Sequence, residues 1–408
     1  MVSENKKMEK KCFNKNKKII FLIKVMCGGG AERVISLLSK AMIQKGYDII
    51  LILTHQKKEE ADLKDIDPAI QVIALEDEIT HLPEPVFKAN MRMLYARLLG
   101  KLGKVEVSSI NKYYARNYRK VIWLKEYFKK DKESTIIAFL YDSIFLTMLS
   151  KTSTNRVILS ERGDPQQSAA SKTTMAFLHK MFPKADNIVF QSPDVSKWYQ
   201  DNMNVKGTVI FNPIKAALPE RFEGIRKKRI VNFCRISDQK NLELLVNAFA
   251  RLNKDYPEYE LFIYGDAVGN GAEGYLDKIK SLVELRGLQS KINILPGLKD
   301  IHTEIRDYAM FVSSSDFEGM SNSMLEAMAI GMPVVCTDCP AGGARAVIKD
   351  HENGLLVPVK NEEKMYLAMK EIIETPELAE ELSRNAVQIR KEQSLEKIIK
   401  KWMEIIND

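Results

Sequence analysis

The stretch YAMFVSSSDFEGMSNSMLEAMAIGMPVVCT, residues 308–337, contains two apolar segments on either side of a helical pattern. The segments YAMFVSS (308–314) and MPVVCT (332–337) are short and bounded by polar residues, as buried strands are. Between them, a helix capped by one of residues 321–323 can run up to Gly331, and glycine is the residue type favoured just past a helix end. A strand, a helix and a second strand in this order predict a parallel α/β sheet.

The same alternation extends through the rest of the chain and divides into two series. The predicted strands of the first series are 18–23, 48–54, 70–75, 134–140, 155–160, 187–192 and 207–214. Those of the second series are 230–234, 260–265, 291–297, 308–314, 332–337 and 354–358. Helical patterns between the strands include 31–45, 241–254 and 273–286. We therefore expect two consecutive α/β domains.

The domain boundaries follow from these two series and from a charged stretch, 219–229, that separates them. We expect a basic, solvated tail over residues 1–17, followed by a Rossmann-like domain over 18–212. A basic helical insertion occupies about 84–130 of that domain. A second Rossmann-like domain is expected over 213–385. The remaining segment, 386–408, is predicted to be a helix that packs back towards the first domain.

The composition is that of a soluble globular protein: 45% of the 408 residues are hydrophobic and 28% are charged. No apolar run approaches the roughly 18 residues that span a bilayer. Five scattered cysteines do not make a disulfide framework, so we expect a reducing, cytoplasmic environment. Cys336 and Cys339 form a CxxC, but no second ligand pair accompanies them, and two small buried residues at a strand end are the simpler interpretation.

Positive charge is concentrated in residues 86–130, which hold twelve Lys/Arg and only Glu106 and Glu126 against them. Aromatic and aliphatic residues at helical spacing lie between these cations, which suits the surface of an anionic membrane. We expect Arg116, Arg119 and Lys120 to contribute to that binding. Nucleic acid is a rival partner, and a solvated helical hairpin with no partner is the alternative that involves no binding.

Three glycines, Gly28, Gly29 and Gly30, follow the first predicted strand and precede a helix. Glycines let backbone N–H groups approach an anion closely, and a helix N-terminus favours negative charge. A dinucleotide fingerprint would need a third spaced glycine where Arg33 stands, and the phosphate-binding GK[ST] pattern is also missing. The loop is therefore predicted to hold a phosphate or a substrate, with a tight strand–helix turn as the alternative.

The second domain carries two cations and two carboxylates directly after its strands. Arg235 follows the strand 230–234, and Lys240 precedes the helix 241–254. Two cations at such an edge suit a diphosphate. Glu318 lies in the loop before the helix of the opening stretch and Glu326 lies inside that helix, where carboxylates can accept hydrogen bonds from sugar or ribose hydroxyls. Taken alone, either the two cations or the two glutamates would more often be ordinary charged residues on the protein surface.

Together, CRISDQKN (234–241) and DFEGMSNSMLEAMAIGMPVV (316–335) resemble the retaining glycosyltransferases of family 4. That family has an Arg-x-x-x-x-Lys after the first strand of its second domain and a later E-x7-E. GGGAERV (28–34) and ENGLLVP (352–358) match two further family stretches. The resemblance covers most of the chain from about residue 18, and it is closest to enzymes that build capsular polysaccharide, exopolysaccharide and lipopolysaccharide.

The resemblance implies the GT-B fold, in which two Rossmann-like domains face each other across a cleft. It also implies transfer of a sugar from a nucleotide-sugar, expected to be a UDP-sugar, to a glycan acceptor that is lipid-linked. By position, Arg235 and Lys240 would bind the diphosphate, Glu318 the donor sugar and Glu326 the ribose. Backbone contacts would come from the residues that follow Glu318, namely Gly319, Met320, Ser321 and Asn322.

In the first domain, the resemblance places Gly28, Gly29 and Gly30 beside the diphosphate and the acceptor. A polar residue after a late strand often lies near the transferred sugar in this family. The stretch LSERGDP (159–165) occupies that place with Glu161, Arg162 and Asp164, and it lacks the histidine that many members have. Arg162 is the residue that we assign to this role.

The expected chemistry places charge on a leaving nucleoside diphosphate as the sugar becomes oxocarbenium-like. Fixed cations and helix N-termini stabilise such charge, so neither a metal nor another cofactor is expected. The one DxD, Asp65 and Asp67, precedes a proline in a polar connection and is a poor metal site. The glutamates are expected to hold hydroxyl groups and not to act as the acid and base of a glycosidase.

Several alternatives remain at this point. A soluble enzyme of the sucrose- or glycogen-synthase type would use the same motifs without a membrane. A non-catalytic nucleotide-sugar-binding subunit would bind the donor without turnover. A nicotinamide-dependent oxidoreductase would need the dinucleotide fingerprint that this chain lacks. The preferred expectation is a cytoplasmic enzyme, peripheral at the inner face of the membrane.

Overall fold

A computed structural model describes residues 18–408 apart from 81, 83–85, 170, 216 and 270. The described chain divides into two compact units. The first contains the described residues up to Phe190, together with Ser196–Ile210 and Ile399–Asp408. The second contains Gln191–Val195 and Phe211–Ile398. The tail predicted over residues 1–17 lies outside the described residues.

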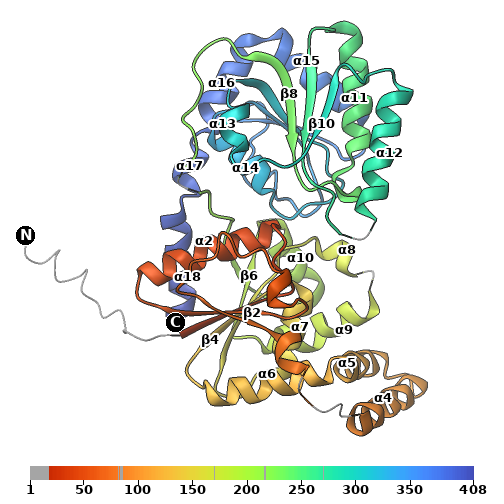
Figure 1. The fold of residues 1–408 in the computed structure, drawn as a ribbon, viewed down its shortest axis with the longest axis vertical. Coiled ribbons are helices and arrows are strands. Elements are labelled where there is room, and N and C mark those ends of the chain that lie inside the picture. Colours follow the sequence, from red (N-terminus) through yellow and green to blue (C-terminus); the bar gives the residue numbers. More distant parts are fainter. Residues whose placement is uncertain (1–17, 81, 83–85, 170, 216, 270) are drawn as a thin grey trace, which may run out of the picture. The chain divides into compact units, whose positions relative to one another are not determined.

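The first unit is built on a seven-stranded parallel sheet with the order β3-β2-β1-β4-β5-β6-β7 (Figure 1). Its strands are β1 (Lys18–Ile23), β2 (Asp48–Leu53), β3 (Gln71–Ala74), β4 (Thr135–Phe139), β5 (Arg156–Ser160), β6 (Asn187–Phe190) and β7 (Thr208–Val209). Ile19 to Ile23 of β1 are fully buried, as expected for a parallel strand covered on both faces.

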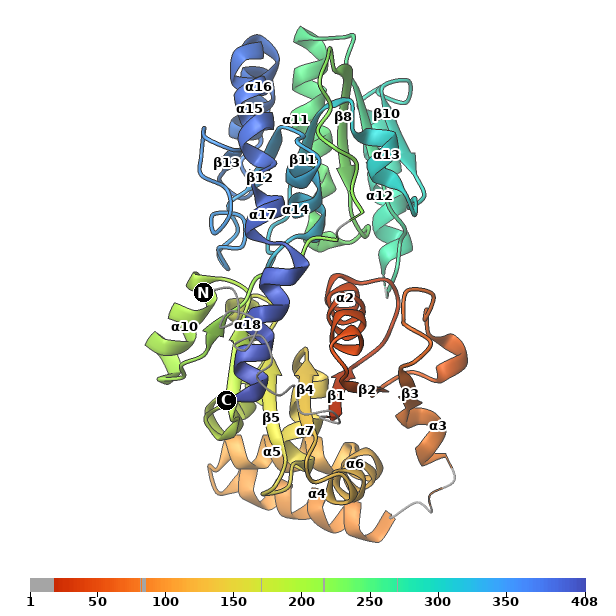
Figure 2. The same ribbon diagram turned by 90° about the vertical axis from the view of Figure 1, so that its left-hand side faces the viewer.

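The helices of the first half of the chain connect these strands. They are α2 (Gly30–Gln44), α3 (Leu75–Ile79), α4 (Val86–Lys101), α5 (Val105–Arg116), α6 (Tyr118–Lys130), α7 (Tyr141–Ser150), α8 (Pro165–Ala169), α9 (Lys172–Met181) and α10 (Pro193–Met203). Two 3₁₀ turns, η1 (Lys58–Glu60) and η2 (Phe182–Lys184), complete the set. The insertion expected over about 84–130 is therefore formed by three helices, α4, α5 and α6, of which α4 lies outermost (Figures 1 and 2).

The second unit is built on a six-stranded parallel sheet with the order β10-β9-β8-β11-β12-β13. Its strands are β8 (Lys227–Phe233), β9 (Glu260–Tyr264), β10 (Ile292–Leu295), β11 (Tyr308–Ser313), β12 (Val334–Thr337) and β13 (Leu355–Val357). Its helices are α11 (Leu242–Asp255), α12 (Ala272–Leu285), α13 (Ile301–Ile305), α14 (Asn322–Ala329), α15 (Glu362–Glu374), α16 (Pro376–Ala386) and α17 (Ile389–Glu392), with the 3₁₀ turn η3 (Asp238–Lys240). The last helix, α18, spans Leu395–Asn407.

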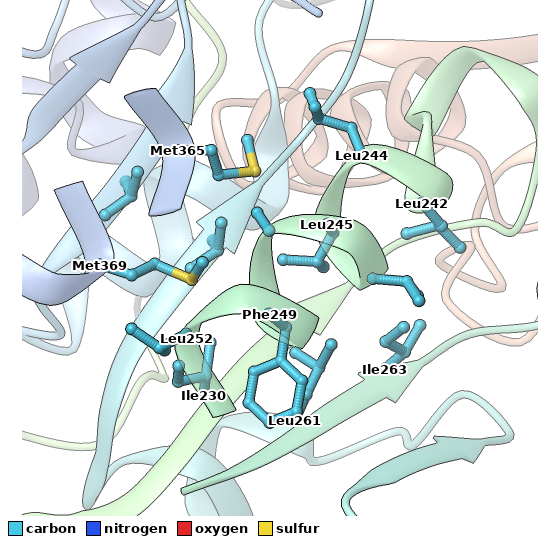
Figure 3. Packing of buried hydrophobic residues seen from close by; sticks show 14 of the residues in the cluster. Ile230, Leu242, Leu244, Leu245, Phe249, Leu252, Leu261, Ile263, Met365 and Met369 are labelled. Carbon is cyan, nitrogen blue, oxygen red and sulfur yellow. The ribbon is translucent and has the colours of Figure 1, made fainter. Parts of the chain in front are cut away.

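The second sheet separates two apolar cores because successive strand residues point to opposite faces. Ile230 packs with the core that contains α11, α12 and α15, whereas its neighbour Val231 packs with the core that contains α13 and α14. Figure 3 shows Phe249 and Leu252 of α11 over Ile230 and Leu261. This packing holds the start of α11 next to the end of β8.

In both sheets the strand order reverses at one point, between β1 and β4 and between β8 and β11. Ligands of open parallel sheets bind outside the carboxyl ends of strands at such a switch point. The loops that follow β8 and β11 contain Arg235 and Glu318, and the loop that follows β1 contains Gly28 to Gly30. The order of the strands therefore groups the predicted residues at two sheet edges.

Several elements differ from the sequence expectation. β7 is shorter than the strand predicted over 207–214, since it spans only Thr208–Val209. β8 begins at Lys227, inside the charged stretch expected to be a linker, because its charges are paired: Lys227 with Asp307 at 2.9 Å and Arg229 with Glu260 at 3.6 Å. The single helix expected over 386–408 is two helices, α17 and α18, with a break at Ser394. Residues from Ile399 onward belong to the first unit.

Candidate functional site

A charged pair connects the loops that follow β8 and β11. The Nζ of Lys240 lies 2.6 Å from Oε2 of Glu318, and their side chains are 14% and 22% exposed. Burial opposes the ionisation of Lys240, but the adjacent charge of Glu318 outweighs it and holds the lysine pKa above its ordinary value. Gln239 donates a second hydrogen bond to the same Glu318 oxygen at 3.3 Å. Lys240 is therefore held in its charged form, and the pair is fixed in one geometry.

The backbones of these two loops are also joined. Ser314 donates its hydroxyl to the carbonyl of Lys240 at 2.8 Å, and the side-chain amide of Asn241 donates to Asp316 at 2.7 Å. Asn241 has a φ of 42°, in the left-handed region, and its Oδ1 accepts from the N–H of Leu244 to cap α11. A non-glycine residue in this conformation stores strain, which often accompanies functional loops.

Arg235 is exposed directly after β8, at the same sheet edge. Within the described part of the chain it makes no hydrogen bond or ion pair. Its charge nevertheless acts on two neighbouring groups. At Cys234, burial raises the thiol pKa and the Arg235 charge opposes this rise; at Lys240, both burial and the Arg235 charge lower the pKa, against the larger effect of Glu318. Arg235 and Lys240 are thus close enough to act on one anion, and Arg235 has no carboxylate partner to displace.

The loop from Gly319 to Asn322 ends in the start of α14. The hydroxyl of Ser321 accepts a hydrogen bond from the N–H of Met324, which makes Ser321 the helix cap, and Met320 is buried. The amide of Asn212 donates both to the Met320 carbonyl at 3.2 Å and to the Asn322 side chain at 2.7 Å. Asn212 therefore fixes the loop from behind, a role that no sequence pattern indicated.

A second brace of this loop is the close approach of two glycines. A side chain at Gly343 would overlap with the carbonyl oxygen of Gly319. The segment after β12 therefore packs backbone against backbone on the Glu318 loop. A small pocket beside Glu318 is lined by Ser321 and Met324 and by the buried thiol of Cys339, which donates to the Ser315 carbonyl at 3.2 Å.

Glu326 is inside α14 and is 4% exposed. Its Oε2 lies 2.8 Å from Nε2 of His302, which comes from α13 and is 2% exposed. The imidazole therefore donates from Nε2, and Nδ1 of His302 has no hydrogen-bond partner among the described residues. Sequence analysis predicted a role for Glu326 but not for His302, because their contact depends on the packing of α13 against α14.

In the first unit, the glycine loop is already occupied by a carboxylate of the same chain. Gly28 has a φ of 79°, and the N–H groups of Cys27 and Gly29 donate to Oε2 of Glu32. Glu32 is buried and lies in the first turn of α2. The loop thus has the geometry of an anion cradle, and Glu32 fills part of it. The sequence did not single out Glu32.

Glu161 and Arg162 follow β5 and are both buried. Burial raises the pKa of Glu161 to about 7, against hydrogen bonds from the Gly163 N–H and from Tyr141. Burial also lowers the pKa of Arg162 to about 9. The Arg162 guanidinium donates to Ser160 at 2.8 Å.

Aromatic rings cover Arg162. Its guanidinium carbon lies 4.9 Å from the ring centre of Phe139 and 5.9 Å from that of Trp402, and these two rings stack on each other. Asp164, the third polar residue of this stretch, is 5% exposed. Arg162 is therefore an interior residue of the first unit. The Glu161 carboxyl reaches Tyr141, whose hydroxyl lies 3.0 Å from that of Tyr199.

Part of the basic segment 86–130 is structural. Lys120 is 8% exposed and its Nζ lies 2.6 Å from Glu76, and Arg119 donates to the backbone carbonyls of Ile79 and Leu82. The expectation that Arg119 and Lys120 face a membrane is therefore wrong, because both hold α6 against the α3 region. Within this segment, most of the exposed large apolar side chains lie on α4 and directly after it.

Residues 220–389 match the family model of glycosyl transferases group 1. An uncharacterized glycosyltransferase of Haemophilus influenzae is 24% identical over 95% of this chain and 98% of its own length. A Campylobacter jejuni N-acetylgalactosamine-N,N'-diacetylbacillosaminyl-diphospho-undecaprenol 4-alpha-N-acetylgalactosaminyltransferase is 27% identical over 60% of this chain and 68% of its own length.

Among solved structures, sucrose-phosphate synthase of Thermosynechococcus elongatus superposes with a TM-score of 0.76, 17% identity, and coverage of 95% of this chain and 98% of its own. Anabaena HepE in complex with UDP-glucose superposes with a TM-score of 0.73, 16% identity, and coverage of 96% and 99%. The two parallel α/β units thus have the GT-B fold, and the match to the glycosyl transferases group 1 model lies within the second unit.

Proposed function

We propose that the protein is a retaining glycosyltransferase of family 4 that moves a hexosyl or N-acetylhexosaminyl group from a UDP-sugar to a glycan acceptor. The observation that carries this proposal is the grouping of Arg235, Lys240 and Glu318 at the switch point of the second sheet, in the domain that matches the family model. A ligand at such an edge meets two cations and a carboxylate.

The cations have distinct tasks in this proposal. Arg235 offers a planar guanidinium without a carboxylate partner among the described residues, which suits two oxygens of a diphosphate. Lys240 keeps its bond to Glu318 and uses its remaining N–H groups for phosphate, since an ammonium group has three donors. The N-terminus of α14 adds further positive potential. These groups stabilise the leaving diphosphate, so we propose that no metal ion is required.

The remaining contacts follow from the same loop. Glu318 accepts from hydroxyls of the donor sugar, and the backbone of Gly319 to Asn322, braced by Asn212, contacts phosphate or sugar. Glu326 accepts from the ribose hydroxyls. His302 holds its carboxylate in place. From the first unit, Gly28 to Gly30 contribute to the diphosphate and acceptor side, and Arg162 positions neighbouring groups from the interior.

We further propose that the acceptor is a lipid-linked glycan in cell-surface polysaccharide biosynthesis, and that the enzyme works in the cytoplasm on the anionic inner face of the membrane. Support comes from the Campylobacter relative, whose name specifies a diphospho-undecaprenol acceptor, and from the exposed apolar and basic face of α4. No helix among the described residues is long and apolar enough to cross a bilayer.

A soluble enzyme that resembles sucrose synthase is the second candidate, and the superposition on sucrose-phosphate synthase favours it. The exposed stripe on α4 argues against this candidate, since contiguous apolar surface marks a binding face. A non-catalytic donor-binding subunit would bind UDP-sugars without turnover.

The test is a thermal-shift screen of UDP-, GDP- and ADP-sugars, followed by NMR of the product. At 100 times its dissociation constant, a ligand stabilises the protein by about 2.7 kcal/mol. We expect a UDP-sugar to give the largest shift, the product to keep the anomeric configuration of the donor, and the rate to be unchanged by EDTA. An inverted product would contradict the retaining mechanism, and binding without turnover would identify a non-catalytic subunit.

A further inference from the structure

An open pocket of about 500 Å³ lies in the first unit, and its described lining residues all belong to the helical insertion and not to the proposed sugar site. Lys88 and Arg92 supply its two cations, and Tyr95, Tyr114 and Tyr118 supply aromatic walls. None of the described residues that line the pocket is a carboxylate. Glu106, the acidic residue of α5, is held by His179 at 2.9 Å and by Lys180 at 3.5 Å. The pocket is therefore electropositive.

Arg92 is fixed in this pocket before any ligand arrives. Its guanidinium carbon lies 3.5 Å from the ring centre of Tyr114, and its Nε donates to Oδ1 of Asn111 at 3.0 Å. Asn111 is buried and is itself anchored by a bond to the Val107 carbonyl at 2.8 Å. In the described part of the chain, the two Nη groups of Arg92 have no hydrogen-bond partner. These are the donors that bind phosphate or carboxylate oxygens in pairs.

An exposed apolar stripe runs from this pocket along α4. Its side chains are spaced by four, three and four residues, which places them on one face of the helix, and they are more than half exposed. They are Phe87 (77%), Met91 (51%), Leu94 (60%) and Leu98 (54%), and Leu102 (64%) continues the stripe past the helix end. Phe87 and Met91 belong both to the stripe and to the pocket lining.

The opposite face of α4 packs on α5 through Ala96 and Leu99, so the stripe is a second apolar face of the same helix. Lys88 and Arg92 lie on one side of the stripe at helical spacing, and Arg97 and Lys101 lie on the other. Apolar side chains flanked by cations match the interface of an anionic bilayer, where aromatic rings also settle at the headgroup level.

We infer that the α4–α5 hairpin contains a binding site for the phosphate group of a single anionic membrane phospholipid. Arg92 and Lys88 bind the phosphate, the three tyrosines surround it, and the acyl chains extend along the apolar stripe. The inference rests on the proposed work at a membrane surface, but it does not depend on glycosyl transfer. Such a site differs from general electrostatic attraction to a membrane, because one preorganised arginine, Arg92, should contribute more to the membrane affinity than any other cation of α4.

The test compares Arg92→Gln with Arg97→Gln, which removes the same charge from the same helix outside the pocket lining. Binding is measured by co-sedimentation with phosphatidylcholine vesicles that contain or lack phosphatidylglycerol. One cation near an anionic surface changes the partition coefficient by about five-fold, which we expect for Arg97→Gln. We expect about 50-fold for Arg92→Gln, because its directional hydrogen bonds are lost as well. Equal losses in the two variants would overturn the site.

Two further arms remove ambiguity. Arg92→Lys keeps the charge and loses only the paired donors, so we expect a loss of about ten-fold, which is the part of the Arg92→Gln effect that charge does not explain. Wild-type binding by this variant would contradict the inference. A soluble short-chain phosphatidylglycerol should bind the wild type more tightly than inorganic phosphate does, and equal affinities would indicate a free phosphate site instead. Donor hydrolysis in vesicle-free buffer should be the same in all variants, so failure here is distinguishable from failure of the proposed enzyme activity.

Discussion

Replacing Glu161 with glutamine should remove a pH dependence from the stability of the first unit. The carboxyl is fully buried, and burial raises its pKa from 4.5 to about 7. In the unfolded chain it titrates near 4.5. As the pH rises, the carboxyl therefore loses its proton in the unfolded state before it does so in the folded state. The contribution of this group to the free energy of unfolding is highest below pH 4.5 and decreases until about pH 7. The difference corresponds to about 3 kcal/mol.

The assay is urea unfolding followed by tryptophan fluorescence at several pH values between 4 and 8. All three tryptophans, Trp123, Trp198 and Trp402, belong to the first unit, so the signal reports on that unit alone. Glu161→Gln should be more stable than the wild type at pH 8, by up to about 3 kcal/mol, and the advantage should vanish near pH 4. Glu78→Gln, at an exposed position on α3, is the matched control and should not change the profile. An unchanged slope in Glu161→Gln would refute the reasoning.

Three further predictions concern other contacts of the fold. His302→Phe should raise the KM for the donor about ten-fold with little change in kcat, because Glu326 loses the donor that orients it; an equal effect on a donor without ribose hydroxyls would contradict this role. Gly343→Ala should weaken UDP binding in calorimetry because the new methyl group displaces Gly319, and wild-type affinity would show that the loop does not hold the nucleotide. Lys120→Glu should destabilise the first unit by about 3 kcal/mol in the same urea assay, since it places two carboxylates together, whereas weaker vesicle binding at unchanged stability would restore the surface role.

The sequence predicted the strands well because parallel strands are short, continuous apolar runs. β1 has the predicted bounds, and the cap and end of α14 lie at Ser321 and near Gly331 as expected. The strand order could not be read in this way, since it depends on which long-range pairings form. It is that order which brings the loops of Arg235 and Glu318 to one edge.

The residues that hold the site loops in place could not be predicted either, because they also act through long-range contacts. Asn212 lies more than a hundred residues before the loop that it holds, and His302 and Gly343 act through contacts that no local pattern marks. The high positive charge of the segment led to a wrong prediction for Lys120, because a sequence does not show that this lysine forms an ion pair with Glu76. Local motifs therefore marked the residues that we propose to contact a ligand, but they did not mark the residues that hold those side chains and loops in place.

The central claim is that Arg235 and Lys240 bind the diphosphate of a nucleotide-sugar, and steady-state transfer rates test it most directly. Arg235→Ala and Lys240→Ala should each lower kcat/KM on the order of 10²–10³, with unchanged circular dichroism. Lys280→Ala, an exposed cation of α12 outside the site, is the matched control and should keep the wild-type rate. A wild-type kcat/KM in Arg235→Ala would contradict the account.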